Sequence, residues 1–287
     1  DAVFFFTYHS SDRDWNADAR PPGVILTFEV DRESMSERGP VDMKQVVAAV
    51  DNRLNPGRTR LALVRQAGPE LIEAATFTTD PAELRRIERR VQRLGTIEFR
   101  VLANQRDHPS LIERALEEEG RTLQEADGRL LAWWVPVAAG EEDNLGIGPE
   151  AATRTASDNG PQRMEILVVK DLFDVDGSYL VRVERGADAS GRPCVRFQLN
   201  GRGGRLFGGL TGNHLPDGTT GFSRKLGIIL DGFLVSAPAI RSTISRRGEI
   251  TGSFTQQEVD DLVDVLNAGS LPAPLVKVGE RLPDVEQ

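Results

Sequence analysis

The chain has 287 residues, of which 39% are hydrophobic and 28% charged, and its formal net charge is −9. This length predicts one large domain or two ordinary ones, and the composition is that of a folded globular chain rather than a disordered one. The negative charge argues against nucleic acid as a partner, because phosphate binding needs a basic footprint. The single cysteine, Cys194, excludes an internal disulfide and a cysteine-rich metal site.

The first third of the chain predicts a small sheet covered by two helices. Residues 1–22 begin with the Phe-rich run Val3–Phe6 and should form a poorly ordered lead-in, or the stub of a membrane helix or edge strand. Asp80 caps a helix that has Pro81 at its first position. The order βαββαβ predicts a ferredoxin-like domain over residues 23–105, with strands at 24–30, 60–66, 71–77 and 96–102 and helices at 41–54 and 81–94.

The middle of the chain predicts further strands and one weak helix. A long segment at 138–162, rich in Gly, Pro and acidic residues, should be an exposed loop or insertion. The helix at 203–211 contains four glycines, each of which disfavours a helix by about 1 kcal/mol relative to Ala. The other elements expected here are a helix at 110–119 and strands at 130–137, 164–170, 179–184 and 195–199.

The last part of the chain carries the clearest local signals. Asp231-Gly232 separates two short apolar runs, 226–230 and 233–236, which predicts a hairpin with a type I′ turn. Thr255 and Glu258 form a capping box at the start of a helix that ends at Gly269. Short strands are expected before and after this helix, at 250–254 and 274–278.

Four runs of sequence also resemble a known family. The chain is similar to the first large extracytoplasmic domain of SecD, an accessory subunit of the Sec protein translocase. The similarity covers well over half of this chain. The family's Asp-Leu-x-Gly-Gly motif before the first strand is reduced to Gly23 here. The runs are LGTIEFRVL (94–102), CVRFQLNGRGGRLFGGLTGNH (194–214), LGIILDGFLVSAPAI (226–240) and ITGSFTQQEVDDLVDVLNAGSLPAPL (250–275).

The resemblance implies an α+β protein of two parts. A ferredoxin-like base would consist of residues 23–105 together with a return strand in 271–287, and an α+β head, 106–270, would be inserted between them. Transmembrane helices absent from this chain would flank the domain and hold it on the extracytoplasmic (periplasmic) side of the inner membrane. The hinge between head and base is expected at Gln105, Pro109, Ser270 and Pro272.

The resemblance also implies the function. A SecD or SecDF domain of this kind would bind or hold unfolded preprotein during proton-motive-force-assisted export, and would meet SecF and the SecYEG channel through the full-length protein. No catalytic residue, metal or cofactor is expected. Two alternatives remain open: a structural domain that docks other membrane subunits, and an enzyme in which the 138–162 loop closes over a cleft with strongly shifted acids.

Candidate contact residues follow from local pattern. Trp133 and Trp134 are adjacent on a strand, so they should point to opposite faces, and together with Phe233 they could contact an extended polypeptide. The arginines of one basic helix form either a solvent-exposed face or a surface that contacts anionic lipid or a neighbouring subunit. Its arginines are Arg85, Arg86, Arg89, Arg90 and Arg93.

Motifs that would indicate a metal or nucleotide site are weak. His9, His108 and His214 are far apart in sequence, with no neighbour at metal-ligand spacing. The run Gly201-x-Gly203-Gly204 lacks the Lys-Ser/Thr of a P-loop and the spacing of a dinucleotide fingerprint.

Overall fold

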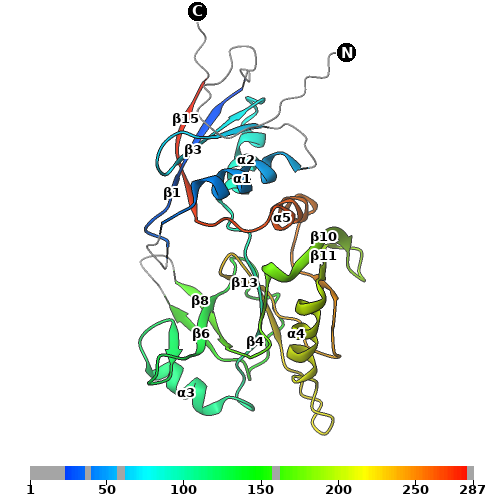
Figure 1. Ribbon diagram of the computed structural model, residues 1–287. Helices are drawn as coiled ribbons and strands as arrows, with labels where there is room; N and C mark the ends of the chain where they lie inside the picture. The colour runs from blue at the N-terminus through cyan, green and yellow to red at the C-terminus, as the bar shows by residue number, and fades with distance from the viewer. Residues whose placement is uncertain (1–22, 36–39, 57–61, 157–161, 283–287) are drawn as a thin grey trace, which may run out of the picture.

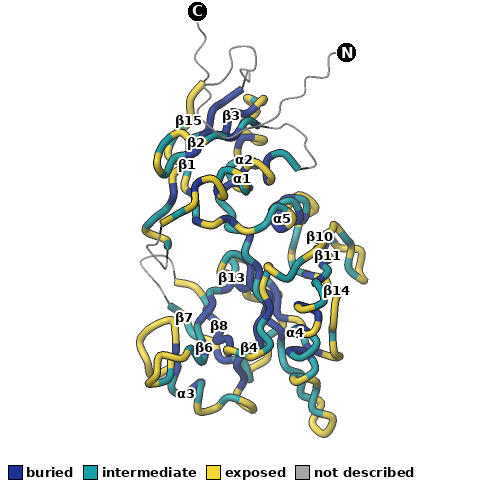
Figure 2. The backbone as a smooth tube through the Cα atoms, in the orientation of Figure 1, coloured by how far each residue is buried: buried dark blue, intermediate teal, exposed yellow. Residues whose placement is uncertain are grey.

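The computed structural model describes residues 23–35, 40–56, 62–156 and 162–282, which form two parts stacked end to end (Figure 1). The expectations for residues 1–22, including Val3–Phe6 and His9, lie outside the described residues. Figure 2 shows the buried backbone in two zones, one beneath α1 and α2 and one around β4, β8 and β13. The mixed helix and sheet content confirms the α+β class.

The first part is a four-stranded antiparallel sheet with two helices on one face, and we call it the base. Its strand order is β15-β1-β3-β2, so the last strand of the chain lies beside the first. This is the order of a ferredoxin-like βαββαβ fold. The elements are β1 (Ile25–Val30), α1 (Met43–Leu54), β2 (Ala62–Gln66), β3 (Leu71–Thr76), α2 (Pro81–Gln92) and β15 (Leu275–Arg281).

The base helices form because their apolar residues repeat at helical spacing. Val46 and Val50 of α1 and Val91 of α2 are fully buried, and they pack on Leu26 and Phe28 of β1 in one core. The predicted cap at Asp80 is confirmed, since its side chain accepts from one backbone amide at the start of α2, and Asp42 caps α1 in the same way by accepting from two.

One strand expected in the base belongs elsewhere. β4 (Ile97–Leu102) pairs antiparallel with β12 (Leu226–Leu230) and with β8 (Arg163–Val169), not with any strand of the base. The prediction that residues 96–102 complete the base sheet is therefore corrected, and the place beside β1 is taken by β15. A short apolar strand that follows a helix is compatible with either sheet on local grounds, so its pairing with distant strands determines to which sheet it belongs.

The second part runs from β4 to α5, and we call it the head. It contains an eight-stranded sheet with the path β13-β12-β4-β8-β6-β5, to which β7 and β9 add at β8 and β4, and a three-stranded sheet β10-β11-β14. The remaining elements are α3 (Pro109–Glu117), β5 (Thr122–Gln124), β6 (Leu130–Pro136), β7 (Thr153–Ala156), β9 (Val175–Asp176), β10 (Leu180–Ala187), β11 (Pro193–Leu199), α4 (Gly201–Gly212), β13 (Phe233–Ser236), β14 (Arg247–Ile250) and α5 (Gln256–Ala268).

The large head sheet curls back on itself. Leu234 of β13 bridges Val137 at the end of β6, and the amide of Ala138 donates to the Leu234 carbonyl at 2.9 Å. The concave face encloses a small core around Ile166 and Ile229, and the other face packs on the helices in a larger one. Both central residues of the β12–β13 turn have positive φ, 50° at Asp231 and 81° at Gly232, which confirms the predicted hairpin.

Two expectations about the head change in detail. The segment 138–162 is not all loop, because β7 lies within it and pairs with β8. The glycine-rich stretch does form a helix, α4, and its glycines are explained by close packing. A Cβ at Gly203 would lie 2.4 Å from the Tyr179 side chain, and one at Gly209 would lie 2.5 Å from the Phe173 ring. Close approach therefore offsets the low helix propensity of these residues.

Candidate functional site at the junction of base and head

Helix α5 lies between the two parts and contacts both (Figure 1). Its apolar side chains, such as Val259 and Leu262, are buried in the head core. The predicted capping box is confirmed, because the Thr255 side chain and the Glu258 side chain each bond the other residue's backbone amide. The helix ends at Gly269, which has φ of 85°.

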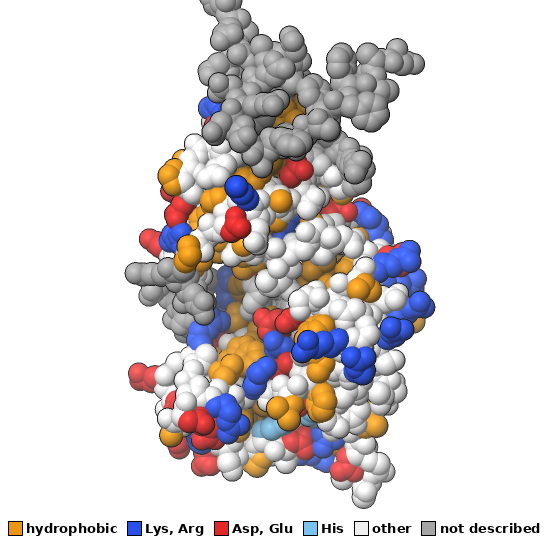
Figure 3. Space-filling view, in the orientation of Figure 1, with side chains coloured by type: hydrophobic (Ala, Val, Ile, Leu, Met, Phe, Trp, Pro, Cys, Tyr) orange, Lys and Arg blue, Asp and Glu red, His pale blue; other side chains and the backbone are white. Residues whose placement is uncertain are grey.

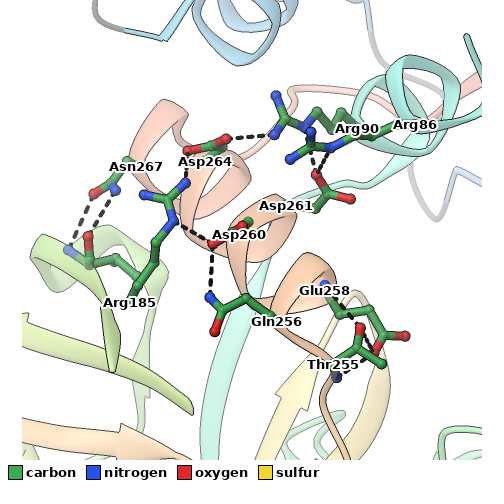
Figure 4. A network of polar contacts seen from close by, with 11 residues as sticks. Arg86, Arg90, Arg185, Thr255, Gln256, Glu258, Asp260, Asp261, Asp264 and Asn267 are labelled. Atoms are coloured by element: carbon green, nitrogen blue, oxygen red, sulfur yellow. Dashed lines mark hydrogen bonds and ion pairs between the residues drawn. The ribbon is translucent and has the colours of Figure 1, made fainter. Parts of the chain in front are cut away.

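The side of α5 that faces the base carries aspartates, and α2 supplies arginines to them (Figure 4). Arg90 Nε lies 2.8 Å from Asp261 Oδ1, and Arg90 Nη2 lies 2.6 Å from Asp264 Oδ2. Arg86 Nε also reaches Asp261 Oδ1, at 2.7 Å. The side chains of Arg90 and Asp261 are only 6% and 8% exposed. Removing one partner of such a buried pair leaves the other charge without compensation, so these contacts specify how the two parts meet.

The other side of α5 binds β10 of the head. Arg185 pairs with Asp260 at 2.6 Å and with Asp264 at 3.0 Å. Burial alone would raise the pKa of Asp260, but hydrogen bonds from Arg185 and Gln256 lower it. The Asn267 side chain accepts from the Val183 amide at 3.2 Å and donates to the Val183 carbonyl at 2.9 Å, as a neighbouring strand would.

Arg53, at the end of α1, ties together the two segments that cross between the parts. Its guanidinium donates to carbonyl oxygens of Arg90, Arg93, Leu94 and Gly269. The residue is fully buried, and burial lowers the pKa of the guanidinium to about 10, an effect that the Asp231 carboxylate partly offsets. The group therefore stays charged at neutral pH and satisfies carbonyls at the ends of α2 and α5.

The first crossing also bonds to the second crossing and to the turn between β12 and β13. The Leu271 amide donates to the Leu94 carbonyl at 2.7 Å, and the Thr96 amide donates to the Asp231 carboxylate at 2.8 Å. Gly95 has φ of 71°, and a Cβ there would lie 2.7 Å from Arg53 Nη2. This closeness explains why glycine stands at position 95.

The structure places the four predicted hinge residues in two different settings. Ser270 and Pro272 lie on the second crossing, between α5 and β15. Gln105 and Pro109 lie inside the head, where the Gln105 amide donates to the Glu150 carbonyl at 2.9 Å. The first crossing is instead the segment 93–96, because β4 is already a head strand. The expected hinge at Gln105 and Pro109 is corrected accordingly.

The predicted basic row on α2 divides into two sets. Arg86 and Arg90 face α5, as described above. Arg85, Arg89 and Arg93 make no ion pair with any carboxylate in the described part of the chain, whereas Arg86 and Arg90 do. A cleft of about 340 Å³ separates Arg89 and Arg93 from the first turn of α5 at Gln257 and Glu258. Contact of this row with lipid or a neighbouring subunit stays a prediction.

The three predicted aromatic contacts differ in accessibility. Trp134 is 3% exposed, and its indole nitrogen donates to the Ala115 carbonyl at 3.2 Å. Trp133 points to the opposite face and is half-buried against the concave core, as expected for adjacent strand residues. Phe233 is 37% exposed. Only Trp133 and Phe233 thus offer surface to a polypeptide, and that contact remains a prediction.

A polar cluster at the far end of the head was not expected from any sequence pattern. Asp107 forms a two-point ion pair with Arg224, which donates at 2.7 Å and 2.9 Å, and this hydrogen bonding lowers the pKa of Asp107 to about 2. Burial lowers the pKa of His108, and His214 is close enough to lower it further. Within the described ranges, no group of three or more metal-ligating side chains is assembled.

Comparison with known proteins finds similarity to SecD and SecDF proteins. The family model described as SecDF, P1 head subdomain, matches residues 152–273. The SecD subunit of protein translocase from Aquifex aeolicus is 42% identical over 108 residues, 38% of this chain and 20% of that protein. The SecD of Rickettsia bellii is 29% identical over 263 residues, 88% of this chain and 48% of that protein. The resemblance stated from the sequence is confirmed.

Solved structures agree on the fold. A structure of SecDF, described as a membrane component that enhances protein export, matches with a TM-score of 0.58 and 22% identity and covers 90% of this chain and 100% of its own. At that identity the match concerns the fold. This chain spans less than half the length of the curated relatives given above. None of the helices described here is long and apolar enough to cross a membrane.

Proposed function

We propose that this chain, part of a SecD-type subunit of protein translocase, holds unfolded polypeptide on the extracytoplasmic side of the membrane during export. The observation that carries the proposal is the two-part architecture. The head is attached to the base by only two crossings, at 93–96 and 269–274, and is oriented by α5. A head attached in this way can change its angle as a unit, which is how a polypeptide could be moved.

The described ends of the chain fit attachment at the base. Ile25 of β1 and Arg281 of β15 are register partners, so the chain enters and leaves the base side by side. We infer that flanking membrane helices hold the base at this end and that the head projects away from the membrane. The proton gradient, SecF and the SecYEG channel would act through the rest of the protein.

Polypeptide would bind through scattered apolar side chains rather than in one deep pocket. On the head, Val181 is 58% exposed and Leu116 is 55% exposed, and Phe233 adds a third apolar position. Such a surface can take many sequences without reading any one closely. Weak and broad affinity is the property that a polypeptide-handling domain needs.

The enzyme alternative finds no support in the charged groups. An acid or base catalyst of the expected kind needs a carboxyl group whose pKa is raised towards neutrality. Among the described carboxyl groups with a shifted pKa, every shift is downward, as at Glu73 and Asp107. The alternative function, docking of other membrane subunits, is compatible with the same two-part domain.

The test is binding of the 287-residue chain to a reduced, unfolded secretory precursor, measured by fluorescence anisotropy, with the folded form of the same precursor as control. We expect saturable binding to the unfolded form alone. A Phe233→Ser variant should weaken it, whereas Phe77→Ser, which changes a similarly exposed phenylalanine on the base, should not. Absence of binding at high protein concentration would reject the proposal and favour subunit docking.

A further inference from the structure

The head carries a group of arginines that have no acidic partner. Arg202, Arg205, Arg246 and Arg247 are all exposed, and none makes an ion pair with a described carboxylate. Nearby arginines behave differently, since Arg185, Arg192 and Arg196 are each paired with an acidic side chain. Arg247 follows Arg246 along an extended strand and so faces the other side of the sheet, and we call the other three residues, Arg202, Arg205 and Arg246, the head arginine patch. Figure 3 shows Lys and Arg side chains gathering on the face over β10, β11 and α4.

Two of these guanidinium groups converge on one point. A Cβ placed on Gly201 would lie 3.7 Å from Arg246 Nη2 and 3.8 Å from Arg205 Nη1. Both groups therefore approach the first turn of α4, and like charges that lie close together repel unless an anion compensates them. In a chain with net charge −9, their approach without a carboxylate is therefore a specific local feature.

The backbone beneath the patch is rigid. The Leu199 amide donates to the Arg246 carbonyl at 2.8 Å, and Arg247 is the register partner of Gln198. A Cβ at Gly204 would lie 2.4 Å from the Ser245 carbonyl oxygen, so this segment lies directly against α4. The backbone positions of Arg205, on α4, and of Arg246, just before β14, are thus held by regular structure, and the entropic cost of binding lies in the exposed side chains.

We propose that the head arginine patch binds acidic stretches of unfolded polypeptide. This inference rests on the proposed function and specifies which polypeptide segments the head prefers. Charge complementarity favours a carboxylate-bearing chain, because arginine matches carboxylate geometry at two points. Three cations on one patch are too few for nucleic acid, which needs a broader basic footprint.

A membrane surface fits the patch less well. The patch is on the head, whereas the register partners Ile25 of β1 and Arg281 of β15 lie at the end of the base sheet. A polypeptide extending past the head would meet the patch, and a lipid headgroup beside the base would not. Exposed apolar residues such as Val181 lie on β10 of the same three-stranded sheet, so a chain with acidic and apolar residues could use both.

The experiment compares two labelled unfolded peptides of about 20 residues that share their apolar residues, one with about six Glu and one with Gln in their place. At low salt we expect the acidic peptide to bind about tenfold tighter, and the preference to shrink with added salt. The variant R205Q/R246Q should lose the preference. A control, R114Q/R129Q, removes one charge on α3 and one between β5 and β6, and it should keep the preference.

The outcomes separate this inference from the proposed function. If both peptides bind equally and R205Q/R246Q changes nothing, the patch has no such role, while polypeptide holding stands. If neither peptide binds, both proposals are rejected. If vesicles containing about 30% anionic lipid bind in a manner that needs Arg205 and Arg246 while the acidic peptide does not, the patch is a lipid surface and the inference is overturned. Thermal melts of each variant confirm folding.

Discussion

The guanidinium of Arg53 donates a 3.0 Å hydrogen bond to the carbonyl oxygen of Gly269, across 216 positions of sequence. Arg53 lies at the end of the first helix of the base, and Gly269 ends the last helix of the head. The same side chain also bonds Leu94, on the other crossing. One buried cation therefore holds both connections between the parts, and the orientation of the head depends on it.

Replacing Arg53 with Met should destabilise the chain by about 3 kcal/mol, because several buried carbonyls lose their donor at once. Arg53→Lys should recover only part of this loss, since an ammonium group cannot reach both crossings with a fixed fork. The free energy of unfolding from urea titration measures both. Arg85→Met, on the exposed face of α2, is the control and should cost less than about 0.5 kcal/mol. Equal stabilities for R53M and R85M would contradict the role of Arg53.

The buried pair of Arg90 and Asp261 should set the angle between the parts. In Asp261→Asn, Arg90 keeps only Asp264, and we expect a broader distance distribution between spin labels at Gln66 of the base and Glu118 of the head, in a background carrying Cys194→Ala. Stability should fall by about 2–4 kcal/mol. Glu184→Gln breaks an exposed pair with Arg182 and should change neither quantity. An unchanged distribution in D261N would mean that apolar packing alone fixes the angle.

Stability at acid pH should depend on the contact between Asp107 and Arg224. Hydrogen bonds from Arg224 lower the pKa of Asp107 from 3.8 to about 2 in the folded chain. The stabilisation is therefore complete above about pH 4 and is lost as the pH falls towards about 2. Both side chains are partly exposed, so we expect it to be about 1 kcal/mol. The difference in urea unfolding free energy between wild type and Arg224→Gln should shrink by that amount from about pH 5 to about pH 2. A constant difference would show that the pair contributes nothing through Asp107 ionisation.

The helix caps and the hairpin turn could be predicted from the sequence because each depends on interactions between residues that are close together in the chain. The cap at Asp80, the capping box of Thr255 and Glu258, and the turn at Asp231-Gly232 each need only a few neighbouring residues. The glycine-rich helix α4 was expected to be weak. What sustains it is contact with distant aromatic side chains, which no local pattern contains.

Long-range pairing was harder to predict. Residues 97–102 form a strand in either interpretation, but only the partners of β4 reveal that it belongs to the head, and those partners lie far along the sequence. The junction was missed for the same reason. Arg53 is a basic residue in the last turn of a helix, an ordinary position, and nothing nearby in sequence indicates that it is buried against Gly269.

Gly95 offers a direct test of how tightly the first crossing is built. Alanine there must adopt φ of 71°, which costs about 1–2 kcal/mol, and its Cβ would lie 2.7 Å from Arg53 Nη2 and 2.8 Å from Val265. We expect Gly95→Ala to lower the free energy of unfolding by about 3 kcal/mol. Gly232→Ala is the matched control, since Gly232 has φ of 81° with open space around it, and should cost only the backbone strain.

The two contributions at Gly95 can be separated with a double-mutant cycle. In an R53M background the Cβ introduced by Gly95→Ala has a more adaptable neighbour, so the cost of this substitution should fall towards that of Gly232→Ala, with a coupling of about 1 kcal/mol. The cost of Gly232→Ala should be the same in both backgrounds. If Gly95→Ala costs no more than Gly232→Ala in the wild type, the close approach of Arg53 does not explain the glycine, and the rigidity attributed to this crossing would have to come from the Leu271–Leu94 hydrogen bond instead.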